Sequence, residues 1–200
     1  MKAEDYRKPL PSFRAPAELD YVEPGTYERV SATAPAVRVM TNLRQVSAGT
    51  VHQDATLIET NQTMIARGVR LLLVVNTEDR IVGLITARDI QGERPIKLIH
   101  ERGGRFEDLQ VRDLMTPRES IDLIEIRDVM RAEVRDVVTT LKEMGRQHAL
   151  VSEKDPVTGR TRICGIFSAT QIGRQLGLPV QVFEVAKTFA EIQTALAKDY

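Results

Sequence analysis

The chain has 200 residues, of which 42% are hydrophobic, and its 28 basic side chains balance its 28 acidic ones. This composition supports one ordinary domain or two small ones, and the zero net charge gives no indication of a general nucleic-acid or anionic-membrane binder. The single cysteine, Cys164, permits no internal disulfide, and the sequence has neither an apolar signal-peptide core nor an apolar run long enough for a transmembrane span. We therefore expect a soluble cytoplasmic protein that neither enters a membrane nor binds nucleic acid.

Residues 1–36 are predicted to form an N-terminal arm. They contain five of the nine prolines, and each proline fixes φ and removes a backbone donor, so long helices and central strands are not expected. The segment also carries four aromatic side chains, Tyr6, Phe13, Tyr21 and Tyr27. These favour an arm that packs onto another surface, with a disordered extension as the alternative.

A first structural unit, with its connector, is predicted over residues 37–104. In chain order it comprises Met-Thr at 40–41, a short strand at 45–51, a helix from Asp54 to a stop at Gly68, a strand at 69–75 and a return strand at 81–85. The strand at 69–75 is an almost unbroken apolar run. Such a run implies burial on both faces, in a sheet that helices cover.

The end of the return strand carries a candidate site. Thr86 is a good helix N-cap and Asp89 follows three residues later, so both side chains are expected at a helix N-terminus, where backbone N–H groups lack partners. The hydroxyl and the carboxylate could hold the hydroxyls of a sugar, with the helix N-terminus near its phosphates. The alternative is a plain capping box, in which Asp89 accepts from the Thr86 backbone.

A second unit, predicted over residues 105–178, repeats the first. An offset of 82 residues carries Gly83 onto Gly165 and Thr86 onto Ser168, whereas Gln171 stands where Asp89 stood. Met-Thr at 40–41 returns as Met-Thr at 115–116. The unit's predicted elements are a strand at 121–126, a helix at 132–144, and strands at 148–151 and 162–167. A repeat at such spacing indicates a duplicated architecture.

Residues 179–200 are predicted to contain an amphipathic helix. Its apolar side chains recur at three- and four-residue steps, with Phe189 near the centre of the stripe. Such a stripe could lie back over the domain or form a dimer contact, and the sequence favours neither.

Each unit carries Met-Thr at its front and Gly-x-x-Thr or Gly-x-x-Ser at its back, and in this respect resembles a CBS domain; the pair resembles a Bateman module. The resemblance covers residues 37–178. It implies an α/β fold of two strand–helix–strand–strand–helix units, packed sheet to sheet around a pseudo-twofold axis. Many members of the family bind adenosine nucleotides in two clefts between the units. The sequence departs from the family pattern at Leu73, where proline is usual, and at Gln171.

The resemblance also implies particular residues for each cleft. In the first cleft, Thr86 and Asp89 would hold the ribose, and the phosphate or base would meet Arg70, Ile126 and Arg127. The second cleft would use Thr50, Val51, Gln147, His148, Ser168 and Gln171. An ionised carboxylate accepts charge-assisted hydrogen bonds from both ribose hydroxyls, whereas an amide offers one acceptor atom. We therefore expect the first cleft to be the better nucleotide site.

Other chemistry has little support in the sequence. His52, His100 and His148 have no metal-ligand spacing, and no nucleophile triad, phosphate-binding loop or dinucleotide fingerprint is present. We therefore expect no metal and no catalytic residue. The only small molecule expected is a bound AMP, ADP or ATP.

The sequence thus predicts a stand-alone regulatory module rather than an enzyme. It would bind an adenine nucleotide and signal through an unknown effector protein or through self-association, with a homodimer expected. One alternative is a structural dimer or adaptor with no physiological ligand, which Gln171 favours. The other is a module for S-adenosylmethionine or another adenosyl ligand.

Overall fold

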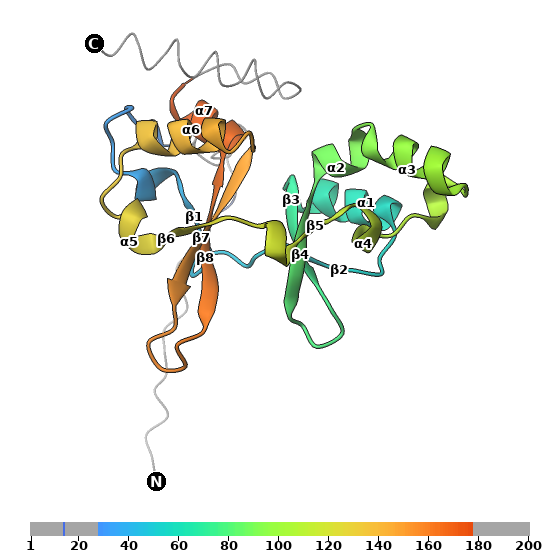
Figure 1. Cartoon of the computed structure of the whole chain (residues 1–200). Helices are drawn as coiled ribbons and strands as arrows, with labels where there is room; N and C mark the ends of the chain where they lie inside the picture. Colours follow the sequence, from blue (N-terminus) through green and yellow to red (C-terminus); the bar gives the residue numbers. More distant parts are fainter. Residues whose placement is uncertain (1–13, 15–27, 178–200) are drawn as a thin grey trace.

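The computed structural model describes Arg14 and residues 28–177. Within this part of the chain, two four-stranded sheets lie side by side and helices flank them (Figure 1). The predicted α/β fold is therefore confirmed. The predicted C-terminal helix and most of the N-terminal arm fall outside the described residues.

The two sheets share one topology. The first has the order β2 (Thr50–His52), β3 (Leu71–Val75), β4 (Ile81–Thr86) and β5 (Thr116–Pro117). The second has the order β6 (Leu123–Glu125), β7 (His148–Lys154), β8 (Thr161–Ser168) and β1 (Thr41–Asn42). In each sheet the first pair of strands is parallel and the other two pairs are antiparallel. The duplication read from the sequence is thus present in the strand pairing.

The helices follow the same repeat. Those of the first half are α1 (Leu57–Arg67), α2 (Ala87–Gln91) and α3 (Arg94–Arg102), followed by the connecting η2 (Phe106–Asp108) and α4 (Val111–Leu114). Those of the second half are η3 (Arg118–Ser120), α5 (Ile126–Val129), α6 (Val134–Glu143) and α7 (Ala169–Gln175), and η1 (Ala36–Val39) precedes β1. Helix α1 begins at a capping box on Thr56 and ends at Gly68, whose φ of 63° suits glycine.

Strand β3 is buried on both faces, as its apolar run predicted. Leu72 and Val74 belong to the core beneath the helices of the first half. Leu71 and Leu73 point the other way and meet Leu150 of β7 in a core between the two sheets. This alternation follows from the two-residue period of a strand. It makes the two sheets face each other through an apolar layer.

Each half takes its edge strand from the segment that precedes the other half. Thr41 of β1 pairs with Ile166 in the second sheet, and Thr116 of β5 pairs with Leu84 in the first. The packing agrees, since Val39 lies in the core of the second half and Val111 in the core of the first. The boundaries at residues 37 and 105 stay predictions about the sequence repeats, whereas the structure exchanges the edge strands between the two halves.

Residues 28–36 of the arm pack onto the second half. The backbone N–H of Val30 donates to the carbonyl of Gln175 at 2.9 Å, and that of Ala36 donates to Ala132 at 2.9 Å. Ala34 and Ala36 are buried in the core beneath α6. This part of the arm is therefore integral to the fold.

Two strand predictions were too long. The strand expected at 45–51 begins only at Thr50, and the one expected at 121–126 covers Leu123–Glu125. Ile126 instead opens α5, which brings Val129, three residues later, into the core of the second half with Ile126 beside it. Burial of Val129 and partial burial of Ile126 at a helical spacing outweigh the strand propensity of the apolar run.

Candidate functional site

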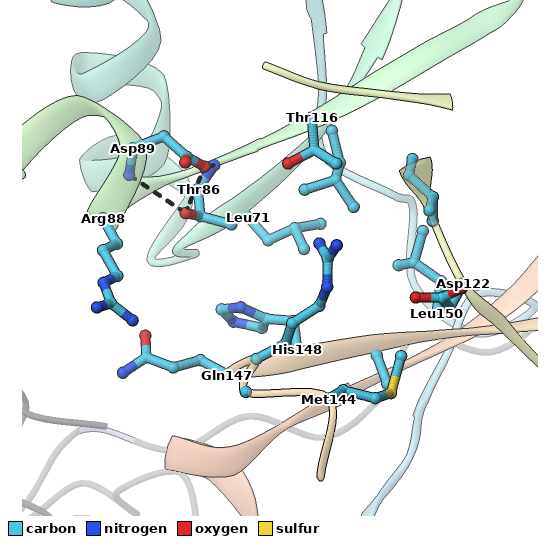
Figure 2. A pocket seen from close by; sticks show the side chains of 15 residues that line it. Leu71, Thr86, Arg88, Asp89, Thr116, Asp122, Met144, Gln147, His148 and Leu150 are labelled. Atoms are coloured by element: carbon cyan, nitrogen blue, oxygen red, sulfur yellow. Dashed lines mark hydrogen bonds between the residues drawn. The ribbon is translucent and has the colours of Figure 1, made fainter. Parts of the chain in front are cut away.

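A first cavity, of about 140 Å³, lies between the two halves (Figure 2). One wall comes from the β4–α2 junction and β5, and the other from the residues that follow η3, the turn after α6 and the start of β7. The lining residues are Leu71, Leu84, Thr86, Arg88, Asp89, Thr116, Ile121, Asp122, Met144, Gly145, Arg146, Gln147, His148, Ala149 and Leu150. The cavity therefore combines apolar walls, which suit a flat ring, with a few polar groups that could orient it.

Thr86 and Asp89 meet in this cavity as a complete capping box. Asp89 Oδ2 accepts from the Thr86 backbone nitrogen at 2.9 Å and from Thr86 Oγ1 at 2.7 Å, and the Asp89 backbone nitrogen donates to Thr86 Oγ1 at 3.4 Å. The Asp89 side chain is only 15% exposed. The capping-box interpretation is thus confirmed, and the same pair lines the cavity, while sugar binding stays a prediction.

Asp89 also forms an ion pair with the start of α3. Its Oδ1 lies 2.7 Å from Arg94 Nη1, and the Arg94 side chain is 53% exposed. Asp89 therefore accepts three hydrogen bonds, and an ionised carboxylate has about four acceptor positions. A sugar hydroxyl could bind at the remaining position, or at the one that Arg94 occupies.

Thr116 lies on the same wall of the cavity as Asp89 (Figure 2), and the sequence did not identify it as a site residue. It reaches the cavity because β5 pairs with β4 beside Gly83. A Cβ on Gly83 would lie 2.5 Å from the Thr116 carbonyl oxygen, so only glycine allows this approach. The repeated Met-Thr pair was the signal that could have identified Thr116.

The opposite wall is formed by Gln147 and His148, at the start of β7. Figure 2 shows the side chains of Arg88 and Gln147 pointing toward each other from the two walls. Burial and, to a smaller extent, the positive charge of Arg70 together lower the pKa of His148 to about 4. His148 is therefore a neutral imidazole at pH 7, able to donate one hydrogen bond and accept another.

A second cavity, of about 210 Å³, lies at the corresponding place in the repeat. Its lining residues are Thr41, Gly68, Val69, Arg70, Leu71, His148, Ile166, Ser168, Thr170, Gln171 and Arg174. Gln171 Oε1 accepts from Thr41 Oγ1 at 3.0 Å, and the Ser168 side chain makes no capping bond. This cavity carries two arginines and no carboxylate, so its chemistry differs from that of the first.

The structure distributes the remaining predicted site residues differently from the prediction. Gln147 and His148, expected in the second cleft, line the first cavity, and His148 lines both. Arg70, expected in the first cleft, lines the second. The residues at the start of each half's central strand, β3 or β7, therefore line the cavity at the helix N-terminus of the other half.

Four predicted residues line neither of these cavities. Thr50 and Val51 belong to β2, which pairs with β3 on the side away from β4. Ile126 packs against the core of the second half, and Arg127 is 79% exposed and pairs with Glu125. None of these four side chains is therefore placed to contact a ligand in either cavity.

No helix of the described residues is long and apolar enough to cross a membrane. Among the same residues, no group of three or more histidine, cysteine, aspartate or glutamate side chains is placed to hold a metal ion.

Comparisons with known proteins identify a matching family model and structures with a similar fold. Residues 36–94 match the family model of the CBS domain. An uncharacterized conserved protein from Pyrococcus horikoshii has a similar structure, with a TM-score of 0.51 and 22% identity over 72% of this chain and 92% of that one. A CBS-domain containing protein from Agrobacterium tumefaciens gives a TM-score of 0.52 and 18% identity over 76% of this chain and 98% of that one. At these identities the likeness concerns the fold.

A relative in sequence is an inosine-5'-monophosphate dehydrogenase from Thermoplasma acidophilum. It is 28% identical over 104 residues, which are 52% of this chain. The matched part spans only 20% of that protein.

Proposed function

We propose that this chain, a CBS-domain protein, is a regulatory module that binds an adenine nucleotide in its first cavity. Thr86 and Asp89 would hold the ribose, and the apolar wall that includes Leu84 and Ile121 would receive the base. Ligand occupancy would change the contact between the two halves. We further propose that the module acts in the cytoplasm, as a homodimer or through an effector protein, and that its role is regulation rather than catalysis.

The observation that carries this proposal is the position of the Asp89 carboxylate. It lies at the edge of a cavity with apolar walls, largely shielded from water, and retains acceptor capacity beyond its capping bonds. Hydrogen bonds to a carboxylate are about twice as strong as neutral ones, and a ribose offers two adjacent donors. A diol-bearing ligand therefore suits this cavity better than one without hydroxyls.

The second cavity supports the expected asymmetry. The Gln171 amide oxygen already accepts from Thr41, and Gln171 Nε2 lies 3.5 Å from Gln175 Oε1. A neutral amide in this position accepts weaker hydrogen bonds than a carboxylate does. We propose that the first cavity is the principal site and that the second, with Arg70, Ser168 and Gln171, binds a nucleotide weakly or takes a different anion.

One observation favours a second candidate, a structural adaptor without a physiological ligand. Arg94 and the capping box already engage both oxygens of Asp89, so the carboxylate is satisfied without any ligand. In that case the two halves would provide a constant surface for self-association. A module for S-adenosylmethionine or another adenosyl ligand remains a variant of the first proposal, because it uses the same ribose.

Thermal unfolding of the full chain with AMP, ADP, ATP and S-adenosylmethionine separates these candidates. A ligand at 100 times its dissociation constant stabilises the folded state by about 2.7 kcal/mol. We expect at least one adenine nucleotide to raise the unfolding temperature in a concentration-dependent way. A response to S-adenosylmethionine alone would select the adenosyl variant, and no response to any of the four would favour the adaptor.

A further inference from the structure

A wider, basic vestibule of about 730 Å³ lies next to the first cavity. We define this vestibule by its lining residues, which are Arg88, Asp89, Gly92, Glu93, Arg94, Lys97, Met144, Gly145 and Arg146. Arg88, Asp89 and Arg146 also line the first cavity, so the two spaces are adjacent and share part of their lining. The vestibule is therefore the path along which part of a bound ligand would extend.

The vestibule carries four cations and two carboxylates. Helix α2 supplies Arg88, helix α3 supplies Arg94 and Lys97, and the turn after α6 supplies Arg146. The first half thus contributes three of these charges and the second half the fourth. Together with Asp89 and Glu93 they leave a local charge of about +2 at pH 7, in a protein whose net charge is zero.

These cations are held loosely or remain accessible. Lys97 Nζ pairs with Glu93 at 2.9 Å, but both side chains are largely exposed, so this pair contributes little stability. Arg146 Nη2 donates to the Ser120 carbonyl at 3.2 Å, which uses one of five guanidinium donors. Arg88 is exposed, and its guanidinium makes no hydrogen bond or ion pair with any described residue. An anion entering the vestibule would find several donors available.

We propose that the ligand of the first cavity carries a diphosphate or triphosphate chain, which the vestibule binds. This inference rests on the proposed function and deepens it, because it selects ADP or ATP over AMP. Arginine recognises phosphate oxygens with paired donors, and lysine binds them as a point charge. With the ribose at Asp89, the phosphates extend toward Arg88, Arg94, Lys97 and Arg146.

Arg94 gives the proposal a specific mechanism. Its guanidinium donates to Asp89 Oδ1 at 2.7 Å. A phosphate chain in the vestibule competes for that guanidinium and draws it away from the carboxylate, which frees Oδ1 to accept a ribose hydroxyl. Phosphate binding and ribose binding therefore reinforce each other. Adenosine has no phosphate to draw Arg94 away, so its ribose hydroxyl must itself displace Arg94 from Asp89 Oδ1.

Isothermal titration calorimetry of the full chain with adenosine, AMP and ATP tests this mechanism, in a buffer with EDTA so that Mg²⁺ does not screen the phosphates. For the unmodified chain we expect affinity to rise from adenosine to AMP to ATP, with ATP about tenfold tighter than AMP. Arg94→Ala should weaken ATP binding and strengthen adenosine binding. Lys97→Ala should weaken ATP binding and leave adenosine unchanged.

Arg80→Ala is the matched control, because Arg80 is an exposed arginine paired with Glu78 in the β3–β4 turn and lines neither space. It should leave all three affinities unchanged. Equal affinities for AMP and ATP, or weaker adenosine binding by Arg94→Ala, would overturn the vestibule proposal while the proposed function stands. If the unmodified chain binds none of the three, the proposed function fails, and this inference fails with it.

Discussion

His148 lines both cavities, and Leu71 occupies the matching position of the first half and also lines both. The pKa of His148 falls from 6.5 to about 4 in the folded protein, because burial and the charge of Arg70 oppose protonation. The unfolded chain therefore binds a proton more readily than the folded chain. The corresponding stability is fully present above pH 6.5 and is lost as the pH falls toward 4.

His148→Leu removes this titration and introduces the residue of the other half. Between about pH 7.5 and pH 5, the unmodified chain should lose up to about 2 kcal/mol more unfolding free energy than the variant. Urea unfolding at the two pH values measures the difference. Equal losses would mean that His148 does not lower stability in acid.

At Asp89 and Gln171, the same position of the repeat carries different chemistry. Asp89→Asn keeps the shape and one capping acceptor but removes the charge, so we expect ATP affinity to fall about tenfold with little change in unliganded stability. Gln171→Ala should leave that affinity nearly unchanged. The calorimetric titration described above measures both variants. A loss caused by Gln171→Ala and not by Asp89→Asn would reverse the assignment of the two cavities.

At the scale of elements, the exchanged edge strands explain the glycine that opens each repeated motif. A Cβ on Gly83 would lie 2.5 Å from the backbone oxygen of Thr116, whereas a Cβ on Gly165 would meet the Met40 side chain, with its sulfur at 2.3 Å. A methionine side chain can adopt another rotamer, but the Thr116 carbonyl is held by the pairing of β5 with β4.

Gly83→Ala should therefore cost more stability than Gly165→Ala. We expect a loss of about 2 to 3 kcal/mol for the first and about 1 kcal/mol for the second, within the range of overpacked interiors. Urea unfolding of both variants provides the comparison, with each glycine serving as the control for the other. A larger loss at Gly165 would mean that the backbone contact at Thr116 relaxes more easily than the Met40 side chain.

At the scale of the whole molecule, the exchange of β1 and β5 ties the two halves together. Val39 lies in the core of the second half and Val111 in the core of the first, and Leu150 joins the sheets in the core between them. Neither half can lose its core without releasing a strand or a packed face of the other. We therefore expect one cooperative unfolding transition, although the chain contains two repeats.

Leu141→Ala tests this cooperativity, because Leu141 is fully buried in the core of the second half. The cavity should cost about 2 to 5 kcal/mol. Hydrogen exchange should then show faster exchange in β3 and β4 of the first half as well as in β7 and β8. Exchange that accelerates in the second half alone would show that the halves unfold independently.

The sequence by itself determined the features that depend on neighbouring residues. The burial of β3 on both faces, the end of α1 at Gly68 and the cap at Thr86 follow from side-chain period, glycine conformation and hydrogen bonding within a few residues. The duplication itself follows from the repeated Met-Thr and glycine motifs. For these reasons the fold and the pairing of Thr86 with Asp89 could be predicted.

Only the tertiary structure decided what surrounds that pair. It brings Thr116 to the first cavity through an exchanged strand, faces Asp89 with His148 of the other half, and places Arg94 on the carboxylate. It also assigns Arg70 to the second cavity. These positions depend on how two sheets pack through a shared apolar layer, and no spacing along the chain encodes which side chains meet across that layer.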